Sequence, residues 1–100
     1  MLNQVALSGT VVKDPKLKFT LDKEEFCILT LELSSRDGEH EQFDMVVWGE
    51  VAKETVERCG EGSIVATRGR VVNCISNLPE KRMYLSIDRV THIKLEAPKN

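Results

Sequence analysis

The chain has 100 residues, of which 41% are hydrophobic and 30% charged, a composition typical of one soluble globular domain and unlike that of a disordered chain. No apolar run approaches the roughly 20 residues that cross a bilayer, and the N-terminus lacks the pattern of a signal peptide, so we expect no membrane contact and a cytoplasmic location. Cys27, Cys59 and Cys74 are odd in number and widely spaced, which excludes a disulfide scaffold and fits a reducing compartment.

The net charge of −2 is unevenly distributed along the chain. Residues 21–62 carry four basic and twelve acidic side chains, whereas residues 63–100 carry seven basic and three acidic ones. Residues 1–20 carry three lysines and one aspartate. If the two basic ends meet in space they form a positive face, which permits a polyanionic partner, although scattered solvated charges explain the pattern equally well.

The first predicted element is a strand over residues 2–12. It is rich in aliphatic residues and contains Gly9, which is typical of a sharp bend or bulge. The sequence Asp14-Pro15 interrupts this strand, and residues 17–20 continue it beyond the break.

Two further strands, over residues 26–33 and 43–48, are joined by a polar hairpin loop over 34–42. In the first of them one face carries Cys27, Leu29, Leu31 and Leu33, and the other carries Phe26, Ile28, Thr30 and Glu32. Phe26 is therefore exposed, unless the cysteine–leucine face is not the core face.

The hydrophobic period then changes from that of a strand to that of a helix. Residues 50–59 follow helical spacing and Gly60 ends the helix. Strands over 64–72 and 83–95 follow, separated by a long loop over 73–82.

Three strands, one short helix and two more strands do not form βαβ units. The order predicts an all-β domain, a five-stranded Greek-key barrel of the oligonucleotide-binding (OB) fold with one short helix between the third and fourth strands. An open α+β sheet and an SH3-like barrel are the alternatives. We expect one domain over residues 1–95 and a short polar tail over 96–100.

Three separated blocks of sequence resemble one known family. Residues 1–20 contain MLNQVALSG followed by KDPKLKFT, residues 43–48 read FDMVVW before the helix, and residues 62–70 read GSIVATRGR. These blocks are similar, in the same order, to bacterial single-stranded DNA-binding proteins. The resemblance implies a cytosolic OB barrel, usually tetrameric, that coats unpaired DNA during replication, repair or recombination. A looser resemblance is to primosomal replication protein N, which is typically dimeric.

The chain also departs from that family. Gly49, Glu50, Gly60 and Glu61 stand where its members often have basic residues, which should weaken contacts with phosphate. The sequence stops at Asn100 without the acidic tail through which members recruit other proteins, so we do not expect recruitment of that kind.

Binding of unpaired DNA with little sequence preference requires cations along the backbone and flat rings on which bases stack. The candidate cations are Lys13, Lys16, Lys18, Arg68, Arg70, Lys81 and Arg82. The candidate rings are Phe19, Phe43, Trp48 and Tyr84. Each of these cations can instead be an ordinary solvated charge, and each ring an ordinary core contact. For the whole chain, the alternative function is that of a protein-interaction module that has lost most DNA binding.

The sequence offers little support for catalysis. Asp37, Glu39, His40 and Glu41 cluster in the predicted hairpin loop, where a hydrophilic turn explains them. Cys59 lies at the helix C-terminus, whose dipole disfavours a thiolate. We therefore predict a binding protein without enzymatic activity, cofactor or metal.

Overall fold

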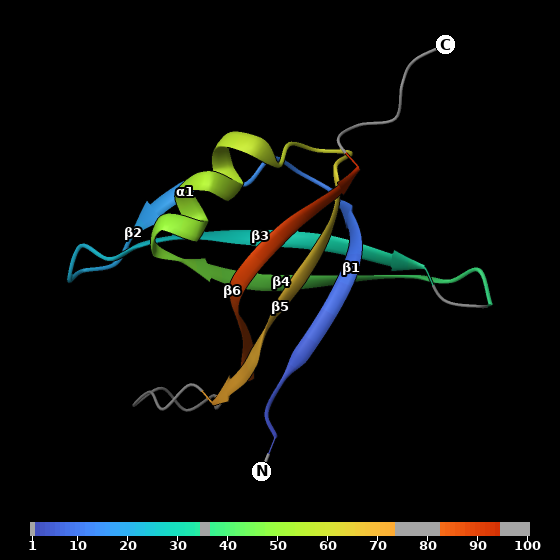
Figure 1. Ribbon diagram of the computed structural model, residues 1–100, viewed down its shortest axis with the longest axis horizontal. Coiled ribbons are helices and arrows are strands. Elements are labelled where there is room, and N and C mark those ends of the chain that lie inside the picture. The colour runs from blue at the N-terminus through green and yellow to red at the C-terminus, as the bar shows by residue number, and fades with distance from the viewer. Residues whose placement is uncertain (1, 35–36, 74–82, 95–100) are drawn as a thin grey trace.

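The computed structural model describes residues 2–34, 37–73 and 83–94, which form a closed barrel with a helix at one end (Figure 1). The elements are β1 (Val5–Val11), β2 (Leu17–Phe19), β3 (Glu25–Ser34), β4 (His40–Trp48), α1 (Gly49–Arg58), β5 (Ile64–Asn73) and β6 (Met83–Lys94). The sheet order is β1-β5-β6-β4-β3-β2, and the additional pairing of β1 with β3 closes five of these strands into a barrel. The predicted five-stranded barrel with one helix is confirmed.

Strands β1 and β2 are the two halves of the first predicted strand. β1 begins at Val5, later than expected, and both halves pair antiparallel with β3, through Thr10 opposite Glu32 and Leu17 opposite Cys27. β1 and β2, on the two sides of the break at Asp14-Pro15, therefore pair with different parts of the same strand, β3. The three residues of β2 extend the sheet beyond the barrel.

Two strand glycines allow the barrel to close. At Gly9, where β1 passes from β5 to β3, a Cβ atom would lie 2.5 Å from the carbonyl oxygen of Glu32. At Gly69, beside a register shift between β5 and β6, a Cβ atom would lie 2.8 Å from the Cα atom of Ile87. Only a residue without a side chain fits at these crossings, as the bend expected at Gly9 requires.

The β3–β4 hairpin is longer than predicted. Its pairing continues to Ser34 opposite His40, so both strands extend into the range 34–42 that was expected to be a loop. The sequence prediction made both strands too short on the side of the loop, because these polar strand ends have no hydrophobic alternation. Backbone pairing does not depend on side-chain polarity. The predicted loop over 73–82 and the tail over 96–100 fall almost wholly outside the described residues.

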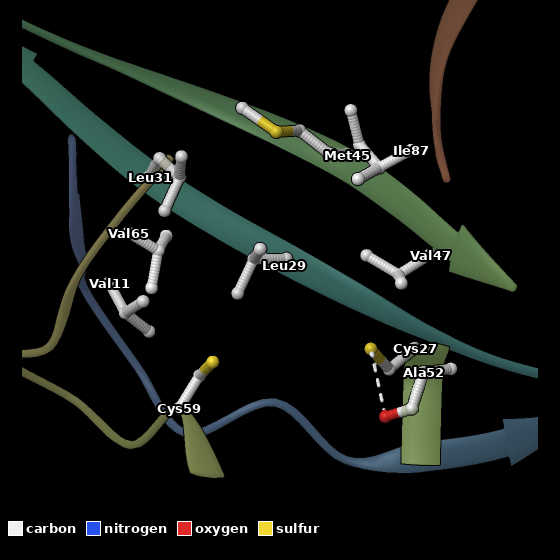
Figure 2. Packing of buried hydrophobic residues seen from close by; sticks show 10 residues of the cluster. All are labelled: Val11, Cys27, Leu29, Leu31, Met45, Val47, Ala52, Cys59, Val65 and Ile87. Carbon is white, nitrogen blue, oxygen red and sulfur yellow. Dashed lines mark hydrogen bonds between the residues drawn. The ribbon is translucent and has the colours of Figure 1, made fainter. Parts of the chain in front are cut away.

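The barrel interior contains the cysteine–leucine face of β3, as Figure 2 shows. Cys27, Leu29 and Leu31 are fully buried there. The remaining members of this core are Val11, Met45, Val47, Ala52, Cys59, Val65 and Ile87. Because these residues fill the inside, the alternate residues of β3 and β4, including Phe26, lie on the outer face.

Candidate functional site

The register of three strands brings a lysine and two aromatic rings into one row on the outer face. Lys18 of β2 is opposite Phe26 of β3, and Phe26 is opposite Trp48 of β4. Side chains of directly opposed residues share a face and lie about 4.5–5.5 Å apart at Cβ. The ring centroids of Phe26 and Trp48 are 5.5 Å apart, with their planes inclined at 41°. Phe26 therefore lies outside the core, half-buried against Trp48.

A second row runs beside the first and ends in an arginine. Ile28 is opposite Val46, Val46 is opposite Ser86, and Ser86 is opposite Arg70. Ile28 and Val46 are half-buried, and Arg70 is exposed. The sequence reasoning left these two aliphatic residues out of the site, although the apolar residues on both faces of residues 26–29 were a signal that the outer face is more than a solvated surface.

Two hollows place predicted cations beside this apolar surface. One, of about 370 Å³, is lined by Trp48, Val51, Arg70, Ser86, Ile87 and Asp88. The other, of about 300 Å³, is lined by Lys13, Asp14, Lys16, Lys18 and Ile28. The structure thus brings together four predicted cations and the tryptophan on one face, although their sequence positions span more than half of the chain.

The backbone near Lys13 and Lys16, between β1 and β2, is tied by hydrogen bonds to the segment that follows α1. Asp14 Oδ1 accepts a hydrogen bond of 2.7 Å from the backbone N–H of Glu61. The backbone N–H of Gly62 donates to the carbonyl oxygen of Val11, and the N–H of Val11 donates to that of Ser63, both at 2.8 Å. The segment after α1 therefore fixes the lysine-bearing connection.

A third hollow on the other side of Trp48 is acidic. Its volume is about 470 Å³, and its lining consists of Lys23, Glu24, Glu25, Trp48, Gly49 and Glu50. Lys53 Nζ lies 3.3 Å from Glu25 Oε1 and 3.5 Å from Glu50 Oε1, and the hydrogen bond and charge of Glu25, with the charge of Glu50, raise the pKa of Lys53. Because this side carries three carboxylates, a polyanion is favoured to approach Trp48 from the side of Arg70 and Lys18.

The two predicted phenylalanine platforms lie elsewhere. Phe43 shares a face with Met45 and Val47 and packs against the core, opposite Leu31. It therefore does not join the outer surface that Trp48 and Phe26 form. Phe19 ends β2 and is 61% exposed.

Of the four remaining predicted residues, two lie on β5 and β6 and two lie outside the described residues. Arg68 is exposed on β5, opposite Arg89 of β6. Tyr84 is half-buried on β6, one residue before Leu85. Lys81 and Arg82 lie outside the described residues.

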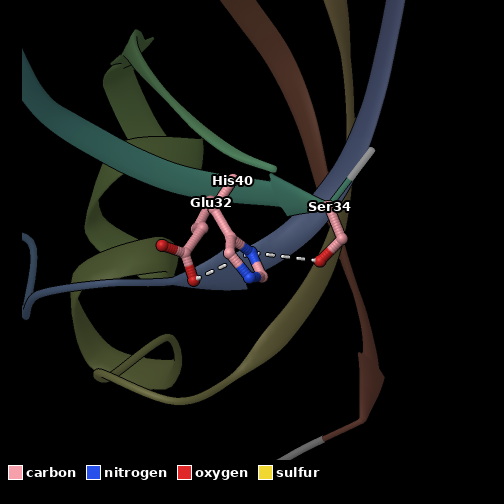
Figure 3. A network of polar contacts seen from close by, with 3 residues as sticks. All are labelled: Glu32, Ser34 and His40. Atoms are coloured by element: carbon pink, nitrogen blue, oxygen red, sulfur yellow. Dashed lines mark hydrogen bonds and ion pairs between the residues drawn. The ribbon is translucent and has the colours of Figure 1, made fainter. Parts of the chain in front are cut away.

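Of the groups that were considered for catalysis, His40 makes contacts at the surface and Cys59 is buried. His40 Nδ1 lies 3.4 Å from Ser34 Oγ and 3.9 Å from Glu32 Oε2, at the loop end of the β3–β4 hairpin (Figure 3). Burial raises the pKa of the Cys59 thiol, an effect that Arg58 partly offsets. Within the described part of the chain no three His, Cys, Asp or Glu side chains are grouped to hold a metal ion. None of its helices is long and apolar enough to span a bilayer.

Comparison with known proteins gives concordant results. The model of the Single-strand binding protein family matches residues 2–89. A single-stranded DNA-binding protein of Clostridium tetani (strain Massachusetts / E88) is 33% identical over 76 residues, which are 70% of this chain and 52% of that protein. The single-stranded DNA-binding protein B of Bacillus subtilis (strain 168) is 31% identical over 77 residues, 71% of this chain and 68% of that protein.

A solved structure shows the same fold. The chain is similar to the SSB domain of a protein from Synechococcus sp., with a TM-score of 0.74 and 28% sequence identity over 92% of this chain and 97% of the other. The barrel is thus of the predicted OB type. The chain spans about half the length of the Clostridium tetani relative that it matches.

Proposed function

The chain belongs to the single-strand binding protein family, and we propose that it binds single-stranded DNA on the outer face of β3, β4 and β6. The row Lys18–Phe26–Trp48 carries this proposal, because it places a cation beside two aromatic rings that contact each other. Two similar proteins are named single-stranded DNA-binding proteins, which supports the same ligand.

The proposed binding combines stacking with phosphate neutralisation. One base stacks on Trp48, whose ring is supported from the side by Phe26. Stacking of this kind contributes about 1–3 kcal/mol per base and tolerates any sequence, because every base has a flat face. Arg70 and the lysines of the second hollow neutralise the backbone phosphates on either side. Affinity is therefore expected to fall as the salt concentration rises.

We further propose that the chain acts as a homo-oligomer, tetrameric or dimeric, with residues 1–95 as one binding module. The described outer face offers few rings, so one protomer is expected to bind weakly. Joining several such sites on one strand raises the effective concentration of each and hence the overall affinity. The proposed role is the protection of unpaired DNA in replication, repair or recombination in the cytoplasm, a binding role and not a catalytic one.

The test is a titration of Trp48 fluorescence with a thymidine oligomer at two salt concentrations. Trp48 is the one tryptophan of the chain, so its emission reports on the proposed site alone. Quenching that becomes weaker at higher salt is the expected result. A labelled thymidine oligomer whose fluorescence anisotropy does not change in excess protein at low salt contradicts the proposal.

A second candidate is a protein-interaction module with weak DNA binding, similar to primosomal replication protein N. The acidic hollow beside Trp48 favours it, because a basic segment of another protein would fit the three carboxylates and the ring. The same titration separates the two candidates. Unchanged emission from an intact oligomer favours the protein-interaction role.

A further inference from the structure

The side chain of Asp44 lies on the outer side of β4, within the proposed binding face. Asp44 alternates with Val46 and Trp48 along β4, so all three point to the outer side. Its opposite residue on β3, Thr30, is only 4% exposed, whereas Asp44 itself is exposed. The hydroxyl of Thr30 donates a hydrogen bond of 2.7 Å to Asp44 Oδ1. The carboxylate is thus held in a fixed orientation at the surface.

A carboxylate in this position repels the phosphates of DNA but can accept hydrogen bonds from the edge of a base. Both of its oxygens accept hydrogen bonds, and each retains accepting capacity beyond the bond from Thr30. Among the four DNA bases, only guanine presents two adjacent N–H donors, at N1 and N2, on its Watson–Crick edge. In unpaired DNA this edge is free to be read.

We propose that Asp44 makes the site prefer guanine at one position of the bound strand, an inference that rests on the proposed DNA-binding function. Asp44 lies roughly 13 Å from Trp48 along β4, so it reads a different base from the one stacked on Trp48. Tyr84 occupies the adjacent strand position, since the next residues, Met45 and Leu85, are paired. Its half-buried ring provides the surface on which that guanine stacks.

The experiment compares three oligonucleotides of about sixteen nucleotides, the upper end of what one OB barrel covers. One alternates thymidine with deoxyguanosine, the second replaces guanine by hypoxanthine, which lacks only the N2 amino group, and the third is thymidine alone. A lithium buffer prevents guanine quadruplexes. The wild-type protein is expected to bind the guanine oligomer about five-fold or more tightly than the hypoxanthine oligomer.

The matched variant is Asp44→Asn, which keeps the shape and the bond to Thr30 but presents one acceptor and one donor. This pattern fits the O6 and N1–H groups that guanine and hypoxanthine share and makes no use of the N2 amino group, so the variant is expected to lose the preference for guanine over hypoxanthine. Circular dichroism confirms that the variant is folded.

Two results overturn the inference while leaving DNA binding intact. One is equal wild-type affinity for the guanine and hypoxanthine oligomers, together with measurable binding of the thymidine oligomer. The other is an Asp44→Asn variant that binds every oligomer more tightly by the same factor, which would make Asp44 a source of general repulsion. Failure of the wild-type protein to bind any of the oligomers overturns the proposed function as well.

Discussion

The lysines of the second hollow offer the most quantitative test of the proposed binding face. Lys13, Lys16 and Lys18 are all exposed and line one hollow, so we expect each to neutralise one phosphate. For single-stranded nucleic acid, each neutralised phosphate contributes about −0.7 to the slope of log affinity against log salt. Replacing all three lysines by alanine should therefore reduce the magnitude of the slope by about 2. Between about 50 and 200 mM salt, the advantage of the wild-type protein should shrink about 16-fold.

The assay is the anisotropy of a labelled thymidine oligomer, titrated with protein at several salt concentrations between these limits. The control replaces the same three lysines by arginine, which preserves the charges and should preserve the slope. Because the three side chains are exposed and each such substitution changes stability by at most about 0.5 kcal/mol, the free energy of unfolding of the alanine variant in urea should lie within about 1.5 kcal/mol of that of the wild-type protein. The loss should be equal for oligomers of any sequence, since phosphates carry no sequence information.

A folded triple-alanine variant with the wild-type slope would refute the reasoning. It would mean that the hollow between β1 and β2 does not lie on the path of the backbone, whatever its charge. A loss that differs between sequences would also contradict it, because it would show contacts with bases in place of phosphates.

Three further predictions concern single residues. Trp48→Ala should weaken binding of every oligomer by about 1–3 kcal/mol in anisotropy titrations, whereas Trp48→Phe should retain most of the affinity, and equal losses in both variants would argue against stacking. Gly9→Ala should lower stability by about 1–3 kcal/mol in urea unfolding, because its Cβ atom would meet the carbonyl oxygen of Glu32 at 2.5 Å; an unchanged midpoint would contradict the close crossing. Burial, with a contribution from Cys59, raises the pKa of the Cys27 thiol to about 11 from an ordinary 9.0, so the native state holds this proton more tightly than the unfolded chain. Stability under reducing conditions should therefore be complete below pH 9.0 and fall by on the order of 2 kcal/mol towards pH 11, and Cys27→Ala should flatten this decline.

The sequence predicted the architecture well where local patterns carry the information. Alternation separated the two faces of β3, of which the structure buries the cysteine–leucine face, and the change of period placed α1 to within one residue at each end. The expected bend at Gly9 also agrees with the structure, because a strand glycine at a barrel crossing has a local sequence signature. The ends of the β3–β4 hairpin were missed, since backbone pairing there continues through polar residues without any hydrophobic signal.

The candidate site was predicted as a set of residue types and not as a surface. Lys18, Trp48 and Arg70 were each named from their chemistry, but nothing in the chain order shows that one face collects them. Phe43 was a plausible platform by composition, yet its position in the alternation of β4 directs it towards the core.

The sequence by itself separated the two faces of β3 and β4, because alternation is a property of neighbouring residues along one strand. Only the tertiary structure decided which outward residues become neighbours of one another. The row Lys18–Phe26–Trp48 and the neighbouring row that ends at Arg70 together depend on the register between five different strands. The pairings of β2 with β3 and of β3 with β4 join consecutive strands, whose turns set the register, whereas the step from β4 to β6 joins strands that α1 and β5 separate in the chain, and no local spacing of residues encodes it.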